Sequence, residues 1–115
     1  ELARHTHQFE ITVVGDERVA CYNRVLLSSV LAGDSIEGDL PMLAQGSAGQ
    51  NVQMITGTRI VSVDTSNQTA LTDKGYILAY DTLVFATGAT VARPKAMWER
   101  MEGIRELRTL DDARH

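Results

Sequence analysis

The first apolar stretch of the chain reads Phe9-Glu10-Ile11-Thr12-Val13-Val14-Gly15-Asp16-Glu17. Apolar side chains alternate from Phe9 to Val13, and β-branched residues are frequent, so residues 9–14 predict a strand that ends at the glycine. Ligands of α/β proteins bind beyond the carboxyl ends of strands. The paired oxygens of a carboxylate there suit the two hydroxyls of a ribose. Asp16 and Glu17 are therefore candidate ribose acceptors, and a solvated acidic turn over residues 16–18 is the alternative.

A helical pattern follows between Asn23 and Gly33. Asn23 is a suitable N-cap, and Gly33 is a suitable C-terminal stop. Arg24 stands before the first helical turn, where its guanidinium could pair with a phosphate beside unpaired backbone amides. An ordinary surface arginine before a core helix is the alternative. The apolar side chains expected on one side of this helix are Val25, Leu26, Leu27, Val30 and Leu31.

A run of short strands follows a loose connection over residues 33–51, in which a turn is expected at 42–44. Strands are predicted at 53–56, 58–64, 69–72 and 76–80, and turns at 65–68 and 73–75 join the last three into an antiparallel meander. Residues 83–86 are continuously apolar, as is typical of a strand buried on both faces of a parallel sheet. Together these elements predict an α/β fold with a mixed sheet.

The carboxyl end of the predicted 83–86 strand leads into Thr87 and Gly88. A glycine there lets a ligand approach the backbone closely, and a simple strand-ending turn is the alternative. Another helix is expected from Pro94, with a stripe of Met97, Trp98 and Met101 that is typical of core or interface packing. Near the end of the sequence, Thr109 is a suitable N-cap for a further helix, with Asp112 at its third position.

Composition excludes several classes of protein. The 115 residues suit one domain, and 11 basic against 15 acidic residues give a formal net charge of −4 with no basic stripe, which argues against nucleic-acid binding. No apolar run is long enough to span a bilayer, so a cytoplasmic protein is expected. The single Cys21 excludes an internal disulfide. The spacing of His5 and His7 is a weak metal signal, and no metal site is predicted.

Several motifs together resemble one family. They are Ile11–Glu17, Tyr22–Ser28, Gly57–Asp64, Tyr80–Gly88 and Arg108–Ala113. Their order and spacing are similar to the FAD-binding domain of pyridine-nucleotide-dependent flavoprotein oxidoreductases, a Rossmann-like FAD/NAD(P)-binding fold. The stretch from Tyr22 to Gly33 is most similar to the large subunit of assimilatory NAD(P)H nitrite reductases. Related ferredoxin, putidaredoxin and rubredoxin reductases usually carry an Arg-Pro-Pro-Leu-Ser-Lys version of this stretch.

The resemblance implies cofactor-binding positions. Asp16 and Glu17 fall where the family binds the ribose of FAD, and Arg24 falls where it contacts the flavin nucleotide. The backbone of Ile60 falls beside the adenine. The turn that approaches the cofactor is Ala86-Thr87-Gly88. The chain departs from the pattern at Ser29, where the family often has lysine, and at Ala92, where a basic residue is usual and Arg93 stands one position later. No residue is expected to be catalytic, because the flavin carries the redox chemistry.

The resemblance also implies a larger parent protein. The first strand and its glycine-rich loop are expected before Glu1, and the NAD(P)H domain after His115, together with siroheme and iron–sulfur centres. Residues 1–115 would then form a partial FAD-binding domain, inactive by itself, of an enzyme that passes electrons from NAD(P)H through FAD to a metal centre. The alternatives are a ferredoxin or rubredoxin reductase fragment and a non-catalytic α/β interaction module. Exposed sheet edges predict a homo-oligomer.

Overall fold

The computed structural model describes residues 9–34, 52–92 and 102–114. The chain divides into two compact units. The first comprises residues 1–22 and 41–84, and the second comprises residues 23–40 and 85–115. Each unit is therefore discontinuous in the sequence.

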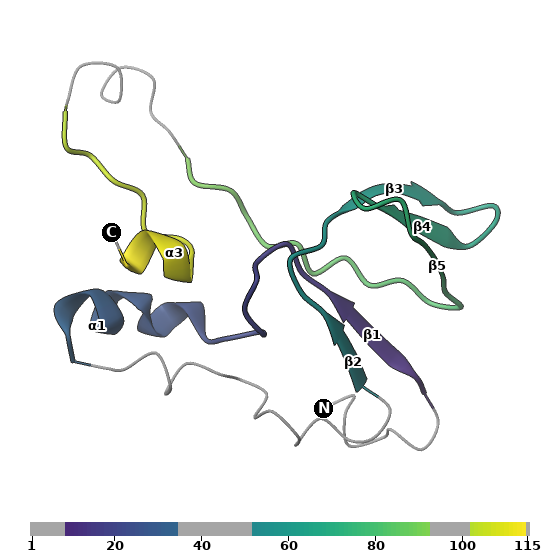
Figure 1. Ribbon diagram of the computed structural model, residues 1–115, viewed down its shortest axis with the longest axis horizontal. Coiled ribbons are helices and arrows are strands. Elements are labelled where there is room, and N and C mark those ends of the chain that lie inside the picture. Colours follow the sequence, from purple (N-terminus) through teal and green to yellow (C-terminus); the bar gives the residue numbers. More distant parts are fainter. Residues whose placement is uncertain (1–8, 35–51, 93–101, 115) are drawn as a thin grey trace. The chain divides into compact units, whose positions relative to one another are not determined.

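A pair of parallel strands begins the first unit. β1 (Ile11–Val14) pairs with β2 (Val52–Ile55) in register from Ile11 opposite Val52 to Val14 opposite Ile55 (Figure 1). The amide of Gly15 extends this pairing by donating to the carbonyl of Ile55 over 2.9 Å. The predicted strands at 9–14 and 53–56 are confirmed, with ends that differ by one or two residues.

A separate antiparallel sheet completes the first unit. Its strands are β3 (Ile60–Asp64), β4 (Thr69–Thr72) and β5 (Ile77–Ala79), in the order β3-β4-β5 (Figure 1). Gly75 supplies a φ of 82° in the β4–β5 turn, which closes through hydrogen bonds between Thr72 and Tyr76. Ala70 and Thr72 are buried on one face of β4. The predicted meander and the α/β class are confirmed, with the parallel and antiparallel pairs in two sheets.

The β3–β4 turn is organised by the Asp64 carboxylate. Its Oδ1 accepts hydrogen bonds from the amides of Ser66 and Asn67 at 2.9 and 3.0 Å, and its Oδ2 accepts one from the Asn67 side chain at 2.7 Å. The backbone and side chain of Asn67, with a smaller part from Ser66, lower the pKa of Asp64 below its usual value of 3.8. These contacts favour the ionised form of the carboxyl group in the folded chain.

We expect an NMR titration of the Asp64 carboxyl carbon to give a midpoint below 3.8. The folded-state pKa is depressed, so the stabilisation by this group is present above its unfolded-state pKa. It is lost as the pH falls through the lower, folded-state value. Replacing Asn67→Ala should move the midpoint back toward 3.8. A wild-type midpoint at or above that value would contradict the prediction.

Two capped helices form the second unit. A 3-10 turn, η2 (Arg24–Leu26), leads directly into α1 (Leu27–Ala32), and α3 (Leu110–Ala113) packs against α1 (Figure 1). The side chain of Asn23 accepts from the amide of Val25 at 3.1 Å, and Gly33 ends α1 with a φ of 79°. Both predicted caps are confirmed. The buried apolar side chains of this unit's described residues are Leu27 and Leu110.

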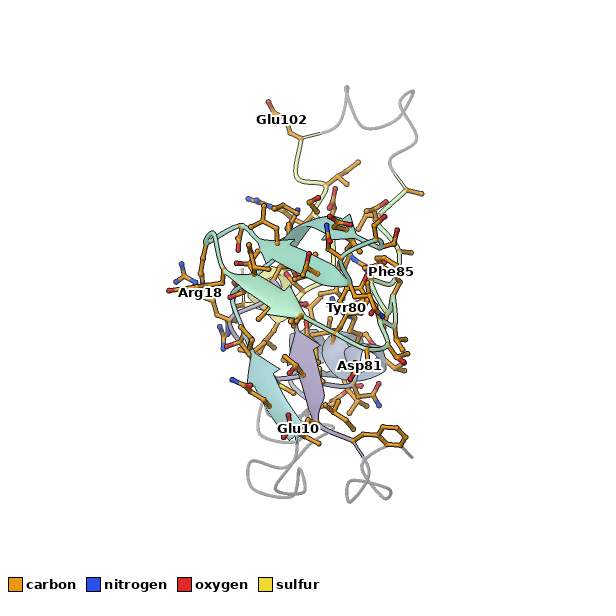
Figure 2. The ribbon with its side chains drawn as sticks, turned by 90° about the vertical axis from the view of Figure 1, so that its right-hand side faces the viewer. Glu10, Arg18, Tyr80, Asp81, Phe85 and Glu102 are labelled. Atoms are coloured by element: carbon orange, nitrogen blue, oxygen red, sulfur yellow. The ribbon has the colours of Figure 1, made fainter. Side chains whose placement is uncertain are left out.

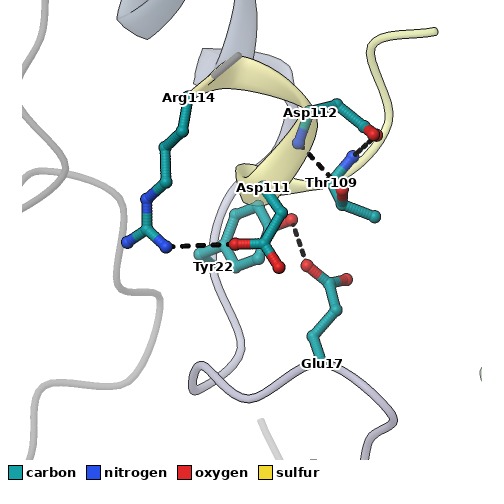
Figure 3. A network of polar contacts seen from close by, with 6 residues as sticks. All are labelled: Glu17, Tyr22, Thr109, Asp111, Asp112 and Arg114. Carbon is teal, nitrogen blue, oxygen red and sulfur yellow. Dashed lines mark hydrogen bonds and ion pairs between the residues drawn. The ribbon is translucent and has the colours of Figure 1, made fainter.

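The start of α3 is a capping box. The Thr109 hydroxyl accepts from the amide of Asp112 at 3.2 Å, and the Asp112 carboxylate accepts from the amide of Thr109 at 2.7 Å (Figure 3). Two amides of the helix start are thereby satisfied reciprocally. The predicted helix start is confirmed with the two residues in their predicted roles.

The apolar side predicted for residues 25–31 is wrong in part. Leu27 is 3% exposed, whereas Val25 is 80% exposed and Leu31 is 59% exposed. Val25 precedes Leu27 by two residues and so points to the opposite side of a helix. α3 is a single turn, so it covers Leu27 and leaves Leu31 in solvent.

The strand predicted at 83–86 is also wrong. The structure assigns no strand there, and Val84 and Phe85 are 71% and 72% exposed (Phe85 is labelled in Figure 2). A strand needs a hydrogen-bonded neighbour, and no strand in the described ranges pairs with this segment.

Other predicted features lie outside the described residues. They are the turn at 42–44, the helix from Pro94 with its Met97, Trp98 and Met101 stripe, and the histidines His5 and His7. Within residues 9–34, 52–92 and 102–114, no helix combines the length and apolar character needed to cross a membrane.

Candidate cofactor-binding site

Because β1 and β2 are parallel, their carboxyl ends lie side by side at the same end of the strand pair. There the amide of Gly57 donates to the carbonyl of Glu17 over 2.7 Å, and the amide of Thr58 donates to the carbonyl of Gly15 over 2.9 Å. These two bonds fix the backbone of the acidic turn against the segment that leaves β2. The predicted acidic residues therefore lie on the edge of the sheet where α/β proteins bind ligands.

The two acidic side chains have different surroundings. Asp16 accepts from Arg59 at 2.8 Å, and these side chains are 54% and 67% exposed. An ion pair at such exposure contributes little to stability. Glu17 is half-buried, and its Oε2 accepts a 2.6 Å hydrogen bond from the Tyr22 hydroxyl (Figure 3). Glu17 is thus held by an uncharged donor, whereas Asp16 is held by a cation.

Ile60 lies in the same unit as the acidic turn. It is the first residue of β3, is half-buried and pairs with Thr72. The preceding residue, Arg59, makes two hydrogen bonds with Asp73. Its amide donates to the Asp73 carboxylate over 3.1 Å, and its carbonyl accepts from the Asp73 amide over 2.8 Å. Because Arg59 also binds Asp16, the structure brings Asp16 and Ile60 into one neighbourhood.

In the second unit, two predicted site residues meet at Arg108. Nη1 of Arg24 donates to the carbonyl of Arg108 over 2.6 Å. A Cβ placed on Gly88, whose φ is 68°, would lie 3.1 Å from Nη2 of Arg108. The guanidinium of Arg108 therefore lies directly over the glycine turn. Ala86 and Thr87 are exposed beside Gly88.

Arg108 is the site residue that the sequence reasoning missed. Its amide donates to Asp112 at 3.0 Å and its carbonyl accepts from Arg24, so the backbone of Arg108 is fixed from two sides. Its side chain also borders an open pocket of about 420 Å³. The pocket is lined by Thr90, Val91, Glu106 and Arg108. The sequence feature next to Arg108 is the Thr109 N-cap, which indicates the start of a helix and not a ligand-binding site.

The residues in each unit fit parts of a dinucleotide. In the first unit, the half-buried Glu17 carboxylate can accept hydrogen bonds from ribose hydroxyls. In the second, the Arg108 guanidinium offers several donors to an anionic group, and Gly88, which has no Cβ, lets that guanidinium lie close against the turn. Among the described residues, no three His, Cys, Asp or Glu side chains are arranged to bind a metal ion.

Comparison with known proteins identifies the class. Residues 1–115 match the family of pyridine nucleotide-disulphide oxidoreductases, and the chain belongs to this family. The family implies FAD and NAD(P)H as cofactors. The predicted family resemblance is confirmed.

Among its relatives, two come from Bacillus subtilis (strain 168). The chain is 32% identical, over 112 residues, to an assimilatory nitrate reductase electron transfer subunit, with 96% of the chain and 14% of the relative covered. It is 40% identical, over 83 residues, to a nitrite reductase [NAD(P)H], with 71% of the chain and 10% of the relative covered.

A solved structure is similar over most of the chain. It is the covalent putidaredoxin reductase–putidaredoxin complex, matched at 31% identity with a TM-score of 0.80 over 97% of this chain and 28% of the matched chain. The fold class predicted from the sequence is confirmed by this likeness. The chain thus spans a small part of each of these relatives.

Proposed function

We propose that this chain binds FAD within an NAD(P)H-dependent reductase of the nitrite reductase type. Electrons would pass from NAD(P)H through FAD to a metal centre. The observation that carries the cofactor assignment is the half-buried Glu17 carboxylate at the carboxyl edge of a parallel strand pair. The nitrite reductase type is supported by 40% identity to an NAD(P)H nitrite reductase.

The proposed roles of the first unit concern the adenosine part of FAD. Glu17 and Asp16 would accept from the ribose, and the backbone at Ile60 would lie beside the adenine. Asp16 is already paired with Arg59, so Glu17 is the stronger candidate for the ribose. This division of roles is supported by the different partners of the two carboxylates.

The proposed roles of the second unit concern anionic and backbone contacts. Arg24 and Arg108 would bind the flavin nucleotide, and the Ala86-Thr87-Gly88 turn would let it approach the backbone. When bound, FAD supplies the ability to accept a hydride and release electrons singly. The residues of this chain would bind and orient it without serving as acids, bases or nucleophiles.

The chain covers 10–14% of its Bacillus relatives, so most of the proposed activity would depend on residues beyond these 115. We place the glycine-rich phosphate loop, the NAD(P)H domain and the siroheme and iron–sulfur centres in that remainder. The 115-residue chain alone would then bind FAD poorly, because it lacks the phosphate loop.

A second candidate is a reductase that passes electrons to a small carrier protein. It is supported by the likeness to putidaredoxin reductase at 31% identity and a TM-score of 0.80. The two candidates share the FAD site and differ in the electron acceptor.

The test uses the full-length gene product that contains this chain. We expect it to purify with the visible absorbance of oxidised flavin, to bleach on addition of NADH or NADPH, and to regain colour on addition of nitrite. Recovery with ferredoxin or rubredoxin, and not with nitrite, would favour the second candidate. A preparation that neither carries nor takes up FAD would overturn both.

A further inference from the structure

The hydroxyl of Tyr22 makes a short hydrogen bond to the acidic turn. It donates to Oε2 of Glu17 over 2.6 Å, and both side chains are half-buried (Figure 3). This distance lies at the short end of the range for O–H···O hydrogen bonds. Such a bond fixes the orientation of the carboxylate as well as stabilising it.

We infer that Tyr22 is a positioning residue that orients the Glu17 carboxylate toward the ribose hydroxyls of FAD. This inference rests on the proposed function and extends it to a residue with no direct role in that proposal. A glutamate side chain has several rotatable bonds, and a ligand that had to order them would bind more weakly. The Tyr22 hydroxyl occupies one acceptor direction of Oε2, and a carboxylate has about four such directions.

The backbone around both residues supports this role. The carbonyl of Glu17 is held by the amide of Gly57 at 2.7 Å, so the start of the glutamate side chain is fixed. Tyr22 forms a β-bridge and directly precedes the Asn23 cap, so its position is fixed as well. The 2.6 Å bond therefore joins two anchored residues, five positions apart, and holds the end of the glutamate side chain.

The neighbouring acid does not have an equivalent partner. Asp16 is bound by Arg59, and both side chains are more than half exposed, so that pair is screened by water. Tyr22 therefore distinguishes Glu17 from Asp16 as the ribose acceptor.

The test measures dissociation constants of the full-length gene product by calorimetry. The ligands are FAD and an FAD analogue whose adenosine ribose lacks both hydroxyls. Tyr22→Phe keeps the ring and removes only the hydroxyl, so we expect about fivefold weaker binding of FAD and no change for the analogue. In a Glu17→Gln background, Tyr22→Phe should add nothing further, because the two residues act as one unit.

Tyr80→Phe is the matched control. The Tyr80 hydroxyl makes a long, 3.5 Å contact to the carbonyl of Asp64 in the same unit, and we expect no change in affinity for either ligand. Glu17→Asp gives an independent measurement, because it leaves Tyr22 intact and shortens the carboxylate. It should reduce the preference for FAD over the analogue.

The outcomes separate the inference from the proposed function. Equal losses for FAD and its analogue in Tyr22→Phe, or losses that add to those of Glu17→Gln, would assign Tyr22 a packing role and overturn the inference. Unchanged binding by Tyr22→Phe, with weaker binding by Glu17→Gln, would also overturn it but leave the ribose assignment intact. A wild-type protein that fails to bind FAD would overturn the proposed function itself.

Discussion

Replacing Gly88→Ala should weaken FAD binding by the full-length protein by more than about tenfold, on the order of the loss of one charge-assisted contact. The new Cβ would stand 3.1 Å from Nη2 of Arg108, closer than such atoms normally approach. Arg108 is fixed at both its amide and its carbonyl, so the guanidinium itself would have to move. Calorimetric titration with FAD gives the affinity.

Gly103→Ala controls for backbone strain. Gly103 has a φ of +84°, close to the +68° of Gly88, but its Cβ would meet nothing within 4 Å. Both substitutions force alanine into the left-handed region at a cost of about 1–2 kcal/mol. If Gly103→Ala weakened FAD binding as much as Gly88→Ala, strain and not displacement of Arg108 would be the cause, and Arg108 would lose its proposed role.

Replacing Leu27→Ala should lower the free energy of unfolding of the 115-residue chain by about 2–5 kcal/mol. Leu27 is 3% exposed where α1 packs against α3, and its removal leaves a cavity in the second unit. Urea denaturation followed by circular dichroism measures the loss. Few other apolar side chains of the described residues are buried to this extent, so little neighbouring material can fill the space.

Leu31→Ala is the control on the same helix. Leu31 is 59% exposed, so the same chemical change should cost less than about 1 kcal/mol. Equal losses for the two variants would contradict the role of Leu27 burial, because alanine has a higher helix propensity than leucine and the substitution by itself should not weaken α1.

Local signals in the sequence predicted the ends of the helices well. Asn23 and Thr109 cap as expected, and Gly33 takes the left-handed conformation that ends α1. Each of these interactions joins residues within a few positions of one another, so its donors and acceptors can be recognised in a short window. The β-meander was predicted for the same reason, since its turn residues lie between neighbouring strands.

Interactions between distant residues were predicted less well. The apolar composition of residues 83–86 suggested a buried strand, but a strand depends on a neighbour that composition does not identify. Val25 and Leu31 were assigned to the same buried face as Leu27, but Val25 lies on the opposite side of the helix, and the single turn of α3 leaves Leu31 exposed.

In the candidate site too, the positions of the residues were predicted from the sequence but their distant partners were not. The sequence located Asp16 and Glu17 at the end of a strand, yet the partner of Asp16 is Arg59, which lies 43 residues away. Arg24 was singled out for its position before a helix, but its carbonyl partner belongs to Arg108, 84 residues away. No local spacing rule connects those pairs, and only the fold brings them together.

The discontinuity of the second unit affects the order in which the chain can fold during synthesis. β3, β4 and β5 are neighbours in the sequence and can pair as soon as Ala79 has left the ribosome. α1 ends at Ala32, but its packing partner begins only at Leu110. At about 5–20 residues per second, the nascent helix would wait roughly four to sixteen seconds. During that interval Leu27 is available to chaperones and to other unfinished chains.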